Sequence, residues 1–143
     1  MKSELKYGIL LTFVSVLFMP SCSDDTNTVS ETKRVEKLLL SETWQVTTVT
    51  VDEASTNVYD GLSLNFSTSS LTSSNGEPLW PASDTWSFLD ESAKAIKRGD
   101  GLVMDIRSIT EAQLKLELTW SKTTMGGGRT SSIAGKHVFT FNH

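Results

Sequence analysis

From Trp44 onward, apolar and polar residues alternate with a period of two, and this pattern constrains the fold more than any other feature. The clearest run is 114–120, where four apolar residues alternate with Lys115, Glu117 and Thr119. Such alternation is typical of a strand with one buried face. The connections are short, and none has the dozen residues that a crossover to a parallel strand requires. The pattern therefore predicts an all-β domain with an antiparallel sheet.

About eight segments carry this strand signal, and turn residues such as Gly99-Asp100-Gly101 separate them. The predicted strands are 44–51, 62–66, 70–73, 85–89, 95–98, 102–107, 114–120 and 137–141. The glycine-rich segment 125–129 is expected to be a mobile or bulged loop. An up-and-down meander of this size must protect its two edge strands, and closing into a barrel removes both edges. We therefore predict an eight-stranded antiparallel barrel, with a β-sandwich as the second choice.

A short helix is predicted ahead of the first strand, over residues 32–40. Val35, Leu38 and Leu39 would share one face of it. The residues before it are polar and rich in Ser, Thr and Asp, a composition typical of a flexible linker. We assign 22–35 to a tether and 36–143 to the barrel domain.

The first 21 residues are expected to be a signal peptide. Lys2 and Lys6 supply positive charge ahead of an apolar stretch that is too short to span a bilayer. This stretch ends in Pro20-Ser21-Cys22, which resembles the lipobox of bacterial lipoproteins. The resemblance implies that Cys22 becomes the mature N-terminus, with a diacylglyceryl group linked to its thiol. Two acyl chains provide durable anchoring, so the expected partner of this end of the chain is a membrane.

The residues after Cys22 predict on which side of that membrane the domain lies. Ser23-Asp24-Asp25 follows directly. An acidic stretch at this place resembles the surface-export signal of lipoproteins in the Bacteroidetes. The resemblance implies an outer-membrane protein whose domain faces the cell exterior. The alternative is a domain that faces the periplasm, with these residues as part of an ordinary linker.

Several motifs of the barrel region resemble the lipocalin-like (calycin) lipoproteins of the Bacteroidetes. They are a short helix running into Trp44, the segments Gly61–Phe66 and Thr85–Phe88, the turn at Gly99–Gly101, and Gly127-Gly128-Arg129 before Phe139 and Phe141. The resemblance covers residues 36–143 and implies the same barrel that the alternation predicts.

Composition excludes several classes of partner. The chain has a formal net charge of −4, and residues 1–21 contain two lysines and one glutamate, so the remaining 122 residues carry −5. Nucleic-acid binding requires clustered Lys and Arg, so no nucleic-acid partner is expected. Cys22 is the only cysteine, which excludes intrachain disulfides and thiolate metal sites. No cofactor is expected.

Enzymatic chemistry is not predicted. The chain has two histidines, His137 and His143, and no nucleophile elbow precedes His137. We expect His137 to pack or to face solvent within the last strand. Asp105 and Glu117 lie in the polar phase of neighbouring strands, which favours a solvated face over a glycosidase pair. No catalytic residue and no metal ligand is therefore assigned.

The tripeptide Arg98-Gly99-Asp100 matches the integrin-binding motif. On a surface protein it would permit a role in adhesion. A tight turn explains the same residues, because Gly and Asp tolerate the backbone conformations that turns require. We favour the turn.

A binding site is predicted near Trp80, which lies between two prolines and outside any strand. An aromatic residue in a rigid loop can line the mouth of a barrel, although Trp80 could equally cap one end of the core. The candidate ligand-binding residues are Trp80, Trp86, Phe88, Met104 and Leu116. If Trp80 lines a mouth, its replacement by alanine should weaken ligand binding and leave the thermal midpoint almost unchanged.

An eight-stranded barrel is wide enough either to be filled by side chains or to hold one small ligand. Its inward-facing set is expected to be Trp44, Leu62, Leu64, Phe66, Trp86, Phe88, Met104, Ile106, Leu116, Leu118, Phe139 and Phe141. The large aromatics in this set favour filling.

By a narrow margin we predict non-enzymatic binding of a small apolar molecule. The alternative is a filled barrel that contacts a partner protein or a glycan at the cell surface. An apolar cavity larger than about 300 Å³ would favour the first function, and a packed interior the second.

Overall fold

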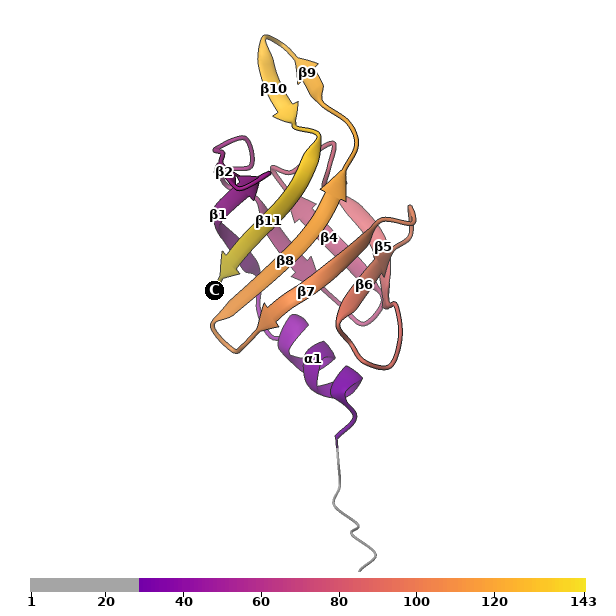
Figure 1. Cartoon of the computed structure of the whole chain (residues 1–143). Helices are drawn as coiled ribbons and strands as arrows, with labels where there is room; N and C mark the ends of the chain where they lie inside the picture. Colours follow the sequence, from indigo (N-terminus) through magenta and orange to yellow (C-terminus); the bar gives the residue numbers. More distant parts are fainter. Residues whose placement is uncertain (1–28) are drawn as a thin grey trace, which may run out of the picture.

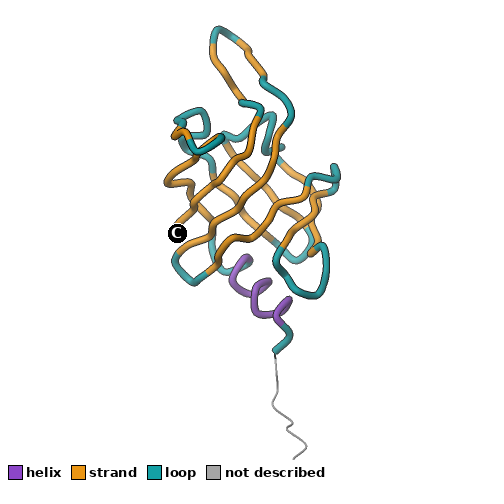
Figure 2. Tube along the Cα trace, in the orientation of Figure 1, coloured by secondary structure: helices purple, strands orange, loops and turns teal. Residues whose placement is uncertain are grey.

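The computed structural model describes residues 29–143. The predicted signal peptide, Cys22 and the first part of the tether lie outside these residues. In the described part, one helix precedes a series of strands (Figures 1 and 2). The elements are α1 (Glu31–Leu39), β1 (Trp44–Val51), β2 (Ala54–Ser55), β3 (Ser63–Phe66), β4 (Ser70–Ser74), β5 (Ser83–Phe88), β6 (Ala95–Arg98), β7 (Val103–Ile109), β8 (Gln113–Trp120), β9 (Thr124–Gly126), β10 (Arg129–Ser132) and β11 (Gly135–Asn142).

The strands form a closed antiparallel barrel, as the alternation predicts. Eight of them follow one another around the wall in the order β1, β3, β4, β5, β6, β7, β8 and β11, and β11 pairs back with β1. The pairing of β8 with β11 is the longest regular one, from Gly135 opposite Trp120 to Asn142 opposite Gln113. Every recorded pair is antiparallel. Closure excludes the β-sandwich.

Three strands were not predicted. The two-residue strand β2 folds back on the end of β1. Strands β9 and β10 pair with each other in a separate two-stranded sheet. The glycine-rich segment 125–129, predicted to be a loop, forms the tip of this hairpin and part of its strands. The hairpin projects beyond the barrel at the end opposite α1 (Figure 1).

Helix α1 lies across the other end of the barrel (Figure 1). It begins after Ser30, whose hydroxyl accepts a hydrogen bond from the amide of Lys33, as serine does at many helix N-termini. Val35 and Leu39 are buried against the barrel, and the indole of Trp44 donates to the carbonyl of Leu39 over 3.1 Å. The folded part therefore begins within 22–35, before the tether boundary that the sequence analysis placed at residue 36.

The interior of the barrel is filled by side chains. Ten of the twelve residues predicted to face inward are buried, and Phe88 and Ile106 are partly buried. Residues outside the predicted set complete the core, among them Tyr59, Leu71, Leu79, Trp80, Ile96 and Leu114. Within residues 29–143, no helix is long and apolar enough to cross a membrane.

Candidate functional site

The five predicted ligand-binding residues belong to the packed core. Trp80, Met104 and Leu116 have no exposed surface, Trp86 is 6% exposed, and Phe88 packs against the core from a partly buried position. The structure therefore brings these residues together as packing partners around one core.

Trp80 closes the end of the barrel opposite α1. Its ring meets the rings of Phe139 and Phe141 edge to face, with centroids 5.4 and 6.4 Å away, an arrangement that aromatic pairs favour. Gly76, at the start of the same loop, lies so close to Trp80 that an added Cβ would be 2.5 Å from the Cβ of Trp80. The loop from 75 to 82 thus folds inward. Of the two interpretations of Trp80, the core cap is the one that the structure shows.

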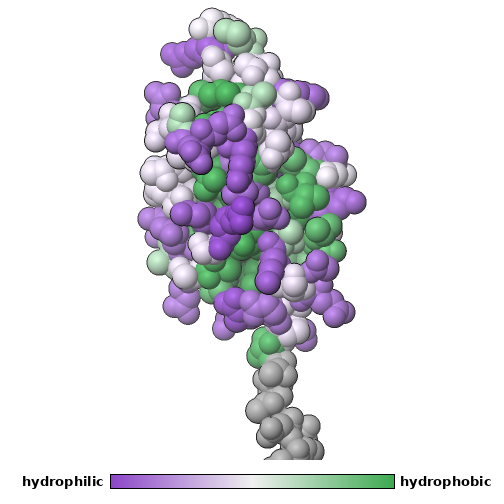
Figure 3. All heavy atoms as spheres, in the orientation of Figure 1, coloured by the Kyte–Doolittle hydropathy of each residue, from purple (hydrophilic) through white to green (hydrophobic). Residues whose placement is uncertain are grey.

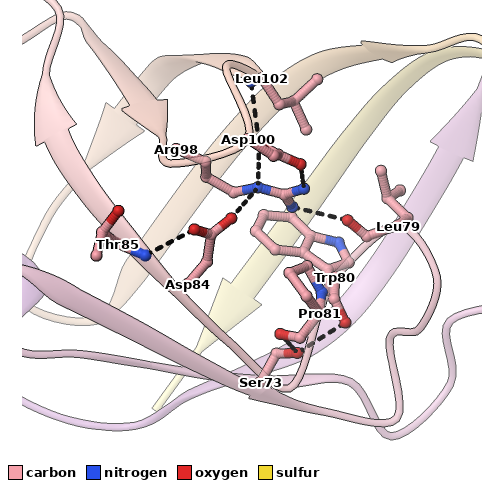
Figure 4. Close-up of polar contacts among 9 residues, drawn as sticks. All are labelled: Ser73, Leu79, Trp80, Pro81, Asp84, Thr85, Arg98, Asp100 and Leu102. Carbon is pink, nitrogen blue, oxygen red and sulfur yellow. Dashed lines mark hydrogen bonds and ion pairs between the residues drawn. The ribbon is translucent and has the colours of Figure 1, made fainter.

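The guanidinium of Arg98 is buried against the face of Trp80, 5.6 Å from the ring centroid (Figure 4). It donates to the carbonyl of Leu79 over 2.7 Å and to the carboxylate of Asp100, and it lies 3.5 Å from a carboxylate oxygen of Asp84. The hydrogen bond from Arg98 lowers the pKa of Asp100. These contacts compensate a charge that would be costly to bury alone, and they fix the loop that carries Trp80.

The same network accounts for the tripeptide Arg98-Gly99-Asp100. Only 1% of the Arg98 side chain is exposed, so its guanidinium cannot reach a receptor in this conformation. The chain turns here with Gly101 at a φ of +90° and a hydrogen bond from its amide to the carbonyl of Arg98. The structure therefore supports the turn and not the adhesion motif.

One polar atom in the closed end has no partner. The Nε1 of Trp80 is the single buried side-chain nitrogen or oxygen in residues 29–143 without a hydrogen bond. Leaving a buried donor unpaired costs about 1–3 kcal/mol. An additional hydrogen-bond acceptor beside this atom would stabilise the closed end.

A second buried polar pair, Tyr59 and His137, lies in the core beside Phe139. The Nε2 of His137 is 2.9 Å from the hydroxyl of Tyr59, and its Nδ1 is 3.0 Å from the carbonyl of Gly135. A carbonyl can only accept, so Nδ1 carries the proton and Nε2 accepts from Tyr59. The amide of Ile133 donates to the same hydroxyl over 3.4 Å. The pair ties two connecting segments, before β3 and before β11, to the core.

Burial lowers the pKa of His137 below its usual 6.5. The unfolded chain then binds a proton at a higher pH than the folded chain does, so the contribution of His137 to stability is complete above pH 6.5 and is lost as the pH falls below it. We expect the free energy of unfolding to decrease by at most about 1.4 kcal/mol per pH unit in this range. Denaturant unfolding from pH 7.5 to 5 measures it. The substitution His137→Phe should flatten this dependence and His143→Ala should not; an unchanged slope in His137→Phe would contradict the assignment.

The two carboxylates that the sequence pattern predicts on a solvated outer face do lie on the outside of the barrel. Asp105 and Glu117 are opposite each other on β7 and β8. Glu117 accepts hydrogen bonds from Arg107 over 2.9 and 2.5 Å and is 3.1 Å from the Nζ of Lys136. The hydrogen bonds from Arg107 are the main cause of a lowered pKa of Glu117. An ionised, paired carboxylate does not serve as a general acid.

Several hollows lie on the described surface, and one of them borders the loop that carries Trp80. Five of them, of about 290 to 510 Å³, are lined by turns, strand ends and α1. None is lined by any of the five predicted ligand-binding residues. In residues 29–143 no three His, Cys, Asp or Glu side chains form a group suited to a metal ion.

Sequence reasoning did not assign Arg98 or Tyr59 to the core, and for His137 it left packing and exposure to solvent open. Arg98 has the same phase as Ile96 in β6, and His137 the same phase as Phe139 in β11. These phases could have predicted that both side chains point inward. Tyr59 lies in an irregular segment with no periodicity, so no comparable signal marked it.

The closed eight-stranded antiparallel barrel is consistent with the lipocalin-like fold that the sequence motifs resemble. The fold alone does not assign a function, because one fold serves many functions. Comparisons of this chain with models of protein families, with curated proteins and with solved structures find no match.

Proposed function

We propose that this chain is a lipid-anchored, non-enzymatic interaction protein. The barrel acts as a rigid scaffold, and its outer wall and loops contact a partner protein or a glycan at the surface of the outer membrane. Cys22 carries the anchor in this proposal. The small apolar ligand that the sequence analysis narrowly favoured becomes the second candidate.

The filled interior is the observation that carries the proposal. Trp44, Trp80, Tyr59, Phe139 and Phe141 have almost no exposed surface. Helix α1 covers one end of the barrel, and the loop with Trp80 closes the other. A molecule held inside would have to displace this packing, whereas a partner outside would not.

The arrangement of the chain supports an orientation relative to the membrane. The anchor precedes α1 in the sequence, so the α1 end would face the lipid. The hairpin of β9 and β10 projects from the opposite end (Figure 1). It would be the part of the domain farthest from the membrane.

Binding of a small apolar molecule is the second candidate, and one atom favours it. The unpaired Nε1 of Trp80 would gain a partner from a ligand that carries a hydrogen-bond acceptor. Such a ligand would have to move the loop 75–82 outward. Trp80, Trp86, Phe88, Met104 and Leu116 would then line its site.

Titration with the fluorescent apolar probe N-phenyl-1-naphthylamine separates the two functions. For a filled barrel we expect no saturable rise in probe fluorescence. A rise that saturates at one probe per chain, together with quenching of tryptophan emission, would contradict the proposal and favour the second candidate.

A further inference from the structure

Strands β7 and β8 diverge toward the hairpin end of the barrel (Figure 1), and we call the space between their separated ends the notch. Their recorded pairing runs from Ile109 opposite Leu114 to Asp105 opposite Glu117 and stops there. Beyond this point, Val103 and Thr119 would be the next pair to exchange hydrogen bonds, yet they are not paired. A hollow of about 360 Å³ occupies the notch.

The backbone groups of both strands point into this notch. In an antiparallel sheet, the amide and carbonyl of successive residues point to alternate sides. The carbonyl of Leu102, just before β7, accepts from the amide of Arg98, and the amide of Ile106 donates to the carbonyl of Lys94, so the backbone groups of these two residues face β6. Val103 and Asp105 must then face β8. The backbone amide and carbonyl of Glu117 point toward Asp105 of β7. Thr119 lies two residues further along β8, so its amide and carbonyl also point toward β7, across the notch.

The free edge continues beyond the barrel. In the part of the chain that the structure describes, the residues of β8 after Glu117 pair only with β11, and β9 pairs only with β10. One side of the chain from Leu118 to Gly126 is therefore without a neighbouring strand. Proteins usually protect such an edge with charged residues or proline, and Lys122 is the single charged residue between Leu118 and Gly126, a stretch that contains no proline.

The side chains around the notch combine apolar and acidic character. Val103, which is 40% exposed, supplies apolar surface on the outer face, whereas the side chain of Leu118 is 3% exposed and belongs to the core. Figure 3 shows apolar residues gathered on this face of the molecule, over the side where β7 leaves β8. Asp105 and Glu117 are the charged residues of the lining. Glu117 forms ion pairs with Arg107 and Lys136. Within residues 29–143 Asp105 forms no such ion pair, so its carboxylate is the one that a partner's cation would meet.

We propose that this notch binds an extended segment of a partner protein by strand addition. The segment pairs with the backbone of Val103 on one side and of Thr119 on the other. It places an apolar side chain against Val103 and, on the same outer face, a Lys or Arg beside Asp105. Main-chain pairing supplies affinity in this mode of recognition, and the side chains supply specificity. The inference rests on the proposed interaction function and names the class of its partner.

The test uses random linear peptides displayed on phage and selected against the full-length chain in detergent. Enriched peptides are synthesised and titrated by fluorescence polarisation. We expect them to share an apolar residue close to Lys or Arg. The substitutions Val103→Lys and Asp105→Lys should each weaken binding by roughly tenfold or more, as loss of a central contact does. Glu111→Lys, the same change of charge at the far end of β7, should leave binding unchanged.

Amide hydrogen exchange distinguishes strand addition from a contact of side chains alone. We expect bound peptide to slow the exchange of the amides of Val103 and Thr119. Selection without enrichment, or peptides whose binding neither lysine substitution changes, would overturn the proposal. A concentration-dependent dimer that Val103→Lys abolishes would also overturn it, because a second copy would then occupy the notch. None of these results contradicts the proposed interaction function, provided that the apolar probe still shows no saturable rise in fluorescence.

Discussion

Replacing Trp80 with alanine is expected to lower the free energy of unfolding by about 3–5 kcal/mol. The ring has no exposed surface and packs on Phe139, Phe141 and Arg98. Its removal leaves a cavity at the end of the core and uncovers a buried guanidinium. Chemical denaturation monitored by far-UV circular dichroism measures the change. This is the opposite of the outcome expected for a residue that lines an open mouth.

The substitution Trp80→Phe is the matched control. Phenylalanine keeps an aromatic ring in contact with Phe139 and removes the unpaired N–H of Trp80. We therefore expect a clearly smaller loss of stability than for alanine. A Trp80→Ala protein that unfolds within about 0.5 kcal/mol of the wild type, as for surface substitutions, would show that Trp80 is not a core residue.

Replacing Cys22 with alanine is expected to move the protein from the membrane fraction to the soluble fraction. The physical reason would be the loss of the two acyl chains that the proposed anchor places on Cys22, each of which would contribute about 0.8 kcal/mol per buried CH₂. Fractionation of a Bacteroidetes host, followed by detection of the barrel domain, measures the shift. Incorporation of labelled palmitate into the wild type and not into the variant provides an independent readout. A variant that still sediments with membranes would contradict the anchor.

The double substitution Asp24→Asn with Asp25→Asn separates anchoring from surface export. It retains Cys22, so we expect the protein to stay in the membrane fraction. Without the acidic stretch, the domain should lose its sensitivity to protease added to intact cells. If protease still removes it from the double variant, the acidic stretch is not the export signal, although Cys22 could still carry the anchor.

The fold could be predicted because its strands follow one physical rule. A strand with one buried face must alternate, and β8, which alternates most clearly, ends at Trp120 as this rule predicts. The rule fails for β2, β9 and β10, which are two to four residues long and too short to show a period. Glycine, which has a low strand propensity, also ends β9 and forms the turn before β10. These strands are set by pairing with a neighbouring strand, which local sequence does not reveal.

The candidate site was less predictable, because its residues depend on tertiary packing. Trp80 lies in a loop between two prolines, and no periodicity says whether such a side chain turns inward. The notch between β7 and β8 depends on where two strands separate, and the alternation of Val103 and Thr119 continues through that point. The alternation of side chains does not show which backbone amides and carbonyls lack a hydrogen-bonded neighbouring strand.

Native mass spectrometry tests the central claim, that the barrel is filled and acts through its outer surface. Residues 23–143 would be purified without denaturation from a Bacteroidetes host and measured before and after unfolding. We expect the mass of the bare polypeptide in both conditions. A reproducible additional mass that disappears on unfolding would contradict the claim, because it would show that the barrel had carried a small molecule.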